Sequence, residues 1–167
     1  IHIGMDFNID PMSAIISNRR GNDLFIFDEI FIYSSNTDEM VQEIKHRYPD
    51  RKIVIYPDPA SRQRKTSAGG KTDLSILRNA GFDIKVRKSH PLVRDRINAV
   101  NSRYCTVSGD RHIFIDPSCR HTIKAAERQT YKEGTSIPNK DGLDHPNDAL
   151  GYKVEYLFPV VTYYEHD

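Results

Sequence analysis

Three aspartates stand where the sequence pattern places a carboxylate at the end of a strand or the start of a helix. Asp6 ends the stretch 1–5, in which apolar residues at every second position predict a strand with one buried face. Asp58 lies between two prolines after the apolar run 52–56, and Asp148 belongs to the first turn of the last predicted helix. If the fold gathers these side chains, the carboxylates repel one another and need a cation between them.

Carboxylate oxygens are the ligands that hard divalent cations prefer, so this set is typical of a Mg²⁺ or Mn²⁺ site. Two such ions held ~4 Å apart can activate water and stabilise the leaving oxygen of a phosphodiester. Each acid also has an ordinary structural explanation. Asp6 and Asp58 can be turn residues, and Asp148 can cap a helix N-terminus, where a carboxylate is favoured. The metal interpretation therefore depends on whether the fold brings the three side chains to one place.

The pattern of elements predicts how that happens. Three strands joined by short turns, at residues 1–6, 13–18 and 24–33, predict an antiparallel meander. A helix from Asn36 to Pro49 follows, and residues 52–56 then read as a strand buried on both faces. A helix between the meander and this strand favours parallel pairing with the first strand through a right-handed crossover. Asp6 and Asp58 would then face each other, with Asp148 completing the set from above.

The remaining elements alternate between helix and strand. Residues 91–104 predict a helix that starts at Pro91 and buries Val93, Ile97, Val100 and Tyr104. The other expected elements are a helix at 72–80, a strand at 82–87, one or two short strands within 106–115, a helix at 117–131 and a last helix running to residue 158. We therefore expect an α/β fold, with a mixed sheet of antiparallel meander and parallel strands flanked by helices.

The composition describes one globular domain. The chain has 167 residues, of which 38% are hydrophobic and 28% charged, and it contains no apolar run of the ~20 residues that a membrane-spanning helix needs. The two cysteines, Cys105 and Cys119, form neither a metal cluster nor a disulfide framework, which fits a reducing cytoplasm. Because Ile1 already lies in a predicted strand, we expect residues 1–167 to be a single domain taken from a longer polypeptide.

The net charge of +1 hides an uneven distribution. The stretch 62–96 is rich in Arg and Lys, whereas residues 141–167 are mostly acidic. A basic zone in a nearly neutral protein indicates either a polyanionic partner met on one face or a merely solvated surface. The basic residues are Arg62, Arg64, Lys65, Lys71, Arg78, Lys85, Arg87, Lys88, Arg94 and Arg96.

The order of elements is that of ribonuclease H-like folds, and three motifs carry a closer resemblance. They are residues 4–8 (GMDFN), 56–60 (YPDPA) and 145–152 (HPNDALGY). With them the chain resembles, over its whole length, the nuclease domain of the large terminase subunit of tailed bacteriophages. The last motif is the most specific of the three, because it is similar to the His-x-x-Asp-Ala-Leu-x-Tyr pattern of that family.

The resemblance implies roles for the motif residues. Asp6, Asp58 and Asp148 would bind two Mg²⁺ or Mn²⁺ ions, and His145 would be an auxiliary ligand or proton carrier. His145 and Asp148 are one helical turn apart, so both can face the same cleft, although a histidine at a helix start needs no role. Asp144 is an outer possibility that a helix cap explains equally well.

The implied activity is a metal-dependent endonuclease that cleaves double-stranded DNA during viral genome packaging, in the cytoplasm of the infected bacterium. The implied partners are DNA, an ATPase domain that would precede Ile1, the small terminase subunit and the portal, without a membrane. In this setting, Arg62, Arg64, Lys65 and Lys71 follow Asp58 in a loose segment and are expected to grip DNA phosphates. Because no aromatic residues are interleaved there, cutting should depend little on base sequence.

Two other kinds of function share these features. A Holliday-junction resolvase or integrase-like enzyme of the same fold would prefer branched DNA or join strands. A non-catalytic DNA-binding or docking module would bind DNA without cleaving it in Mg²⁺ or Mn²⁺.

Overall fold

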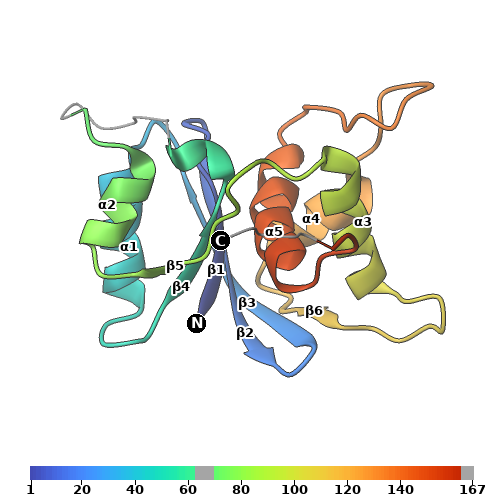
Figure 1. The fold of residues 1–167 in the computed structure, drawn as a ribbon, viewed down its shortest axis with the longest axis horizontal. Helices are drawn as coiled ribbons and strands as arrows, with labels where there is room; N and C mark the ends of the chain where they lie inside the picture. The colour runs from blue at the N-terminus through green and yellow to red at the C-terminus, as the bar shows by residue number, and fades with distance from the viewer. Residues whose placement is uncertain (63–69, 163–167) are drawn as a thin grey trace.

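The computed structural model describes residues 1–62 and 70–162, and it places one mixed sheet between two groups of helices (Figure 1). The six strands lie in the order β5-β4-β1-β2-β3-β6. β1, β2 and β3 form the antiparallel meander, whereas β4, β5 and β6 pair in parallel with their neighbours. The elements are β1 (His2–Asp6), β2 (Met12–Arg20), β3 (Asp23–Ile32), α1 (Thr37–Arg47), β4 (Val54–Pro57), the 3₁₀ helix η1 (Pro59–Arg62), α2 (Asp73–Asn79), β5 (Asp83–Ile84), α3 (Val93–Tyr104), β6 (Ile113–Ile115), α4 (Arg120–Arg128) and α5 (Asp144–Leu157).

The parallel pairing of β4 with β1 confirms the predicted crossover. Met5 lies opposite Pro57 in the register of the two strands, and the amide of Asp58 donates to the carbonyl of Met5 at 3.1 Å. The connection runs through α1, whose N-cap Asn36 accepts from the amide of Glu39 at 3.0 Å. Asp6 and Asp58 therefore end two adjacent strands at the same edge of the sheet.

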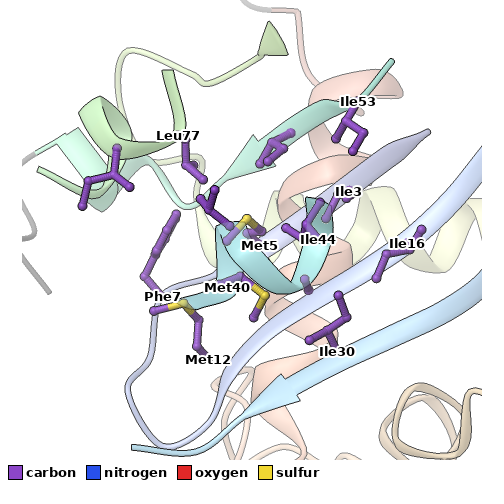
Figure 2. Packing of buried hydrophobic residues seen from close by; sticks show 14 residues of the cluster. Ile3, Met5, Phe7, Met12, Ile16, Ile30, Met40, Ile44, Ile53 and Leu77 are labelled. Carbon is purple, nitrogen blue, oxygen red and sulfur yellow. The ribbon is translucent and has the colours of Figure 1, made fainter. Parts of the chain in front are cut away.

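Alternation along β1 decides which face each side chain meets. Ile3 and Met5 pack with Met40 and Ile44 of α1 in one hydrophobic core, and Figure 2 shows these side chains gathered against the sheet. Because successive strand residues point to opposite faces, Asp6 must point to the other layer, which contains α5. The same parity applies to Asp58, since Ile53 and Ile55 belong to the core with α1.

The second core lies between the sheet and the helices α3, α4 and α5, on the opposite face (Figure 1). Its buried members are Ile15, Leu24, Ile26, Ala99, Val100, Ile113, Cys119, Ala149, Leu150 and Val154. The first and last elements of the domain meet here. α5 packs directly on β1, where a Cβ atom added to Gly4 would lie 2.0 Å from the carbonyl oxygen of Ala149. Only a residue without a side chain permits so close an approach of helix to strand.

The final helix starts earlier than predicted. α5 begins at Asp144, so Asp148 lies in its second turn and not in its first. Pro146 does not interrupt it, because the first amides of a helix have no intrahelical acceptor and proline lacks only that donor. The consequence is that His145 and Asp148 lie within regular helix, where their spacing puts both on one side.

The helix predicted at 91–104 begins at Val93, and its predicted core face is confirmed for Val100 and Tyr104 but not for Val93. Val93 is 45% exposed, whereas Arg96, Ala99 and Val100 are buried. The apolar spacing did not predict the burial in the first turn of the helix, because Arg96, and not an apolar residue, is buried where α3 packs against α5. Two other predicted elements are shorter in the structure: β5 spans only Asp83–Ile84, and α4 spans Arg120–Arg128. None of the helices in the described residues is long and apolar enough to cross a membrane.

Lys153 of α5 is fully buried and gives a prediction about stability. Its Nζ atom donates to the carbonyl of Ile15 at 3.0 Å and to Ser17 Oγ at 2.8 Å, and burial lowers its pKa to about 7. In the unfolded chain the amine stays protonated to a much higher pH, so the unfolded state binds more protons between pH 7 and about 10. The stability of the wild type should therefore rise with pH across this window.

A Lys153→Met variant lacks this titration. We expect it to be roughly 2 kcal/mol more stable than the wild type at pH 7, with the difference shrinking as the pH approaches 10. Denaturant unfolding at several pH values measures the difference, and Lys124→Met on the exposed side of α4 is the control that should show no such trend. A difference that stays constant with pH would show that Lys153 remains charged in the folded domain.

Candidate active site

The ends of β1 and β4 meet the first two turns of α5 at one edge of the sheet. Asp6, Asp58 and Asp144 are each only 7% exposed, whereas the side chain of Asp148 is 32% exposed. Asp6 ends β1 and Asp58 follows β4, and the alternation of side chains along both strands points them to the layer of α5. Asp144 and Asp148 belong to the first two turns of α5. The structure thus brings all the sequence-predicted acids to the same edge.

Asp6 is linked to α5 through a histidine. His145 Nδ1 lies 3.2 Å from Asp6 Oδ2, and the amide Nδ2 of Asn8 lies 3.0 Å from His145 Nε2. A carboxylate can only accept, so Nδ1 donates its proton to Asp6, and the amide nitrogen of Asn8 also lies 3.3 Å from the same Nδ1. The hydrogen bond to Asp6 raises the pKa of His145 against the opposing effect of burial, with the negative charges of Asp144, Asp6 and Asp148 adding to the rise.

Asp58 takes part in the turn that follows β4. Its Oδ1 atom accepts from the amide of Ala60 at 2.8 Å, which is the turn role that a residue between two prolines suggests. The same oxygen lies 3.7 Å from Nδ1 of His90, which belongs to the segment between β5 and α3. Asp58 is therefore fixed by its own turn while its carboxylate remains part of the edge.

Asp148 is held by a buried arginine of α3. The Nη1 atom of Arg96 donates to Asp148 Oδ1 at 2.5 Å, and the guanidinium carbon lies 4.7 Å from the centre of the Tyr152 ring. Burial lowers the pKa of Arg96. The electrostatic interactions with Asp148, Tyr152 and Asp58 and the hydrogen bond to Asp148 outweigh burial, so the pKa is raised overall. The pairing keeps a permanent positive charge beside the carboxylates.

The acids at this edge influence one another electrostatically. Burial raises the pKa of Asp148, and the negative charges of Asp6 and Asp144 add to the rise, whereas Arg96 opposes it. The charges of Asp58, Asp148 and Asp6 also help to raise the pKa of Tyr152, where burial is the largest cause. This concentration of negative charge is what a bound cation would relieve.

The fit to a divalent cation is partial. Among residues 1–62 and 70–162, no three His, Cys, Asp or Glu side chains lie close enough together to hold one ion as they stand. Mg²⁺, however, usually keeps several waters and is bound by one or two carboxylates together with substrate phosphates. Carboxylate oxygens on three elements, close enough that the charges of Asp6 and Asp144 help to raise the pKa of Asp148, suit such an open site better than a closed cage.

Comparison with known proteins identifies the family. The family model described as the terminase RNaseH-like domain matches residues 3–157. The chain belongs to this family. Membership supports a nuclease of the ribonuclease H-like type, and the mixed sheet flanked by helices confirms the predicted fold class. A search of the curated proteins finds none with significant similarity to this chain.

Solved structures share the fold of the terminase domain at low sequence identity. The large terminase of the thermophilic bacteriophage D6E, in complex with ATP-gamma-S, is 18% identical with a TM-score of 0.72, and the match covers 94% of this chain but 40% of that one. The P22 large terminase nuclease domain is 14% identical with a TM-score of 0.67, covering 93% and 80% of the two chains. The nuclease domain of the bacteriophage SPP1 large terminase, with bound Mn, is 19% identical with a TM-score of 0.61, covering 92% and 84%.

Of the four basic residues expected to bind DNA phosphates, the two described differ in their exposure to solvent. Lys71 is exposed, but Arg62 is half-buried and donates to the carbonyls of Val86 and Arg87 at 3.2 to 3.4 Å. Arg64 and Lys65 lie outside the described residues. A grip on phosphates by all four residues thus remains a prediction.

Sequence reasoning missed three residues of the site: Arg96 and His90, which contact Asp148 and Asp58, and Asn8, which contacts His145. Arg96 was noted only as part of a basic zone, although its spacing from Val100 on one helix face was a signal that it is buried. Asn8 stands two residues after Asp6, where a strand ends and an amide can turn back toward the edge. No sequence signal links His90 to Asp58, because the contact depends on the path of the segment after β5.

Proposed function

We propose that this domain is a metal-dependent endonuclease that cleaves double-stranded DNA during viral genome packaging, with two Mg²⁺ or Mn²⁺ ions. The observation that supports this most directly is the arrival of Asp6, Asp58 and Asp148 at one edge of a sheet of the terminase type. Two strand ends and a helix, distant in sequence, each contribute a carboxylate there. A fold held together by these acids for stability alone would gain nothing from crowding like charges.

The identity of the cation follows from ligand chemistry. Asp6, Asp58 and Asp148 would supply the oxygen ligands, and the Mn bound to the SPP1 nuclease domain makes a divalent ion the natural candidate. When bound, such ions supply an activated water and neutralise the charge that develops on the phosphodiester.

The protein's own groups then orient and move protons. Asp6 fixes the imidazole of His145 by accepting from Nδ1, so that the ring is held at the edge where phosphate would lie. His145 can serve as a proton carrier from this position, because a neutral imidazole exchanges protons near neutral pH. Asp58 is held in its turn by the amide of Ala60, which fixes the position of its carboxylate.

DNA would be held mainly through its phosphates. The exposed side chains of Lys71 and Lys88 both follow Asp58 in sequence, and Arg64 and Lys65 would add to them. The chain spans 40% of the D6E large terminase, so cooperation with an ATPase domain of the same polypeptide, the small subunit and the portal belongs to this proposal. The cytoplasm of the infected host is the place where such packaging occurs.

Plasmid nicking in the presence of Mn²⁺ tests the proposal. The wild type should convert supercoiled DNA to nicked and linear forms, and EDTA should abolish the conversion because the carboxylates alone cannot activate water. Asp58→Asn should reduce the rate of nicking at least about 100-fold. Removing a residue that binds the ion directly should slow the reaction more than removing a residue that only supports such a ligand. Circular dichroism should show an unchanged fold.

The same assay separates the rival functions. Cleavage that requires a four-way junction, or strand joining, would instead indicate a resolvase or an integrase-like enzyme. DNA binding without cleavage in either metal would indicate a docking module. Full activity of Asp58→Asn would remove this residue from the metal-binding set.

A further inference from the structure

Arg96 is built into the helix layer and does not project from it. It is 7% exposed, and α5 presents to it one face made of residues 148, 151 and 152. Gly151 makes room for its aliphatic part, because a Cβ atom at that position would lie 3.0 Å from Arg96 Cγ and 3.1 Å from Cδ. Tyr152 stacks on the guanidinium and Asp148 receives its hydrogen bond. Arg96 is therefore a buried structural component of this edge and not a solvent-exposed surface charge.

The hold on Asp148 uses only part of the guanidinium. The hydrogen bond joins a single nitrogen, Nη1, to a single oxygen, Oδ1. An arginine offers five N–H donors in a planar fork that matches a phosphate group as well as a carboxylate. A cavity of about 180 Å³ borders Arg96, Asp148 and Gly151.

We propose that Arg96 is the resident counter-cation of the acidic edge, which stabilises Asp148 without a metal ion and opposes ion binding until the negative charge of a bound DNA phosphate offsets its own. This inference rests on the proposed function. A positive charge next to a carboxylate weakens the binding of a second cation there, and an added anion reverses the effect. Metal and DNA would therefore bind with positive coupling, each strengthening the other.

The charge of Arg96 makes this inference testable without any measurement of cleavage. Isothermal titration of the DNA-free domain with Mn²⁺ should show that Arg96→Gln binds the ion about tenfold more tightly than the wild type. Arg96→Lys, which keeps the charge, should stay within about threefold of the wild type. Arg94→Gln on the same helix is the matched control, because the Arg94 side chain is 68% exposed and pairs with Asp95. It should leave the affinity unchanged.

Coupling to DNA supplies a second readout. Ca²⁺, which takes the same kind of oxygen ligands, is titrated with and without a short DNA duplex whose integrity is checked on a gel. The duplex should tighten ion binding to the wild type, and this gain should be at least about threefold smaller in Arg96→Gln. Thermal melting of each variant verifies that it is folded at the temperature of titration.

The outcomes distinguish this inference from the proposed function. If the wild type binds Mn²⁺ and Arg96→Gln binds it equally or more weakly, Arg96 is only a structural partner and the inference is wrong. If the wild type binds no Mn²⁺, or binds it equally well as Asp58→Asn, the proposed metal site fails and the inference fails with it.

Discussion

Replacing Asp6 by asparagine should abolish the nicking of plasmid DNA while leaving the domain folded. Asparagine has nearly the same shape, and its side-chain oxygen can still accept from His145 Nδ1, so the edge keeps its packing. What disappears is one negative charge of the set, and an amide oxygen is a much weaker ligand for a hard cation than a carboxylate. We expect a loss of at least about 100-fold in the rate of nicking in Mn²⁺.

Asp144→Asn is the informative comparison. Asp144 is as buried as Asp6, but its Oδ1 atom accepts from the amide of Gly142 at 3.2 Å, which is a local capping role. Its replacement should slow nicking less than about tenfold. If Asp6→Asn retained full activity while Asp144→Asn lost it, the metal-binding set would have to be redrawn around α5. Melting temperatures of both variants guard against an effect of unfolding.

Gly4→Ala should destabilise the domain more than any other single methyl group added to the sheet. The new Cβ atom would lie 2.0 Å from the carbonyl oxygen of Ala149 and 2.9 Å from its carbonyl carbon. Both are backbone atoms of α5, so no side-chain rotation can relieve the overlap. Moving the helix away from β1 would open the second core. We expect a cost of at least about 3 kcal/mol in the free energy of unfolding.

The matched substitution is Gly151→Ala, on the other side of the same helix. There the three atoms nearest to the added carbon all belong to the side chain of Arg96, at 3.0 to 3.2 Å, and alanine is the better helix former. The loss of stability should be smaller than in Gly4→Ala, because a side chain can shift where a backbone cannot. Thermal and denaturant unfolding compare the two variants. Equal stability of Gly4→Ala and the wild type would mean that α5 does not approach β1 as closely as the structure has it.

The parts of the fold that the sequence predicts well are those in which one residue pattern has one physical solution. The alternation in residues 1–5 and the capping of α1 by Asn36 predicted β1 and the helix after the meander. The crossover rule then paired β4 with β1, and the adjacency of the two strand ends placed Asp6 beside Asp58. No contact between distant side chains was needed for this part.

The parts that failed depend on such contacts. The apolar stripe predicted for α3 is confirmed at Val100 and Tyr104 but wrong at Val93, because α5 buries Arg96 on this side of the helix. The start of α5 was misplaced, since the loop before it contributes Asp144 as the first helical residue and Pro146 does not stop the helix. The pairs Arg96–Asp148 and His90–Asp58 join segments separated by tens of residues, and no local spacing encodes them.

The packing of α5 on β1 joins the beginning of this domain to its end. Asp6 is synthesised early, whereas Asp148 and His145 leave the ribosome only after the whole sheet. A nascent chain therefore lacks the complete set of acids until its last helix has docked on its first strand. The proposed cleavage activity, which needs this set, would therefore arise only after α5 has docked on β1.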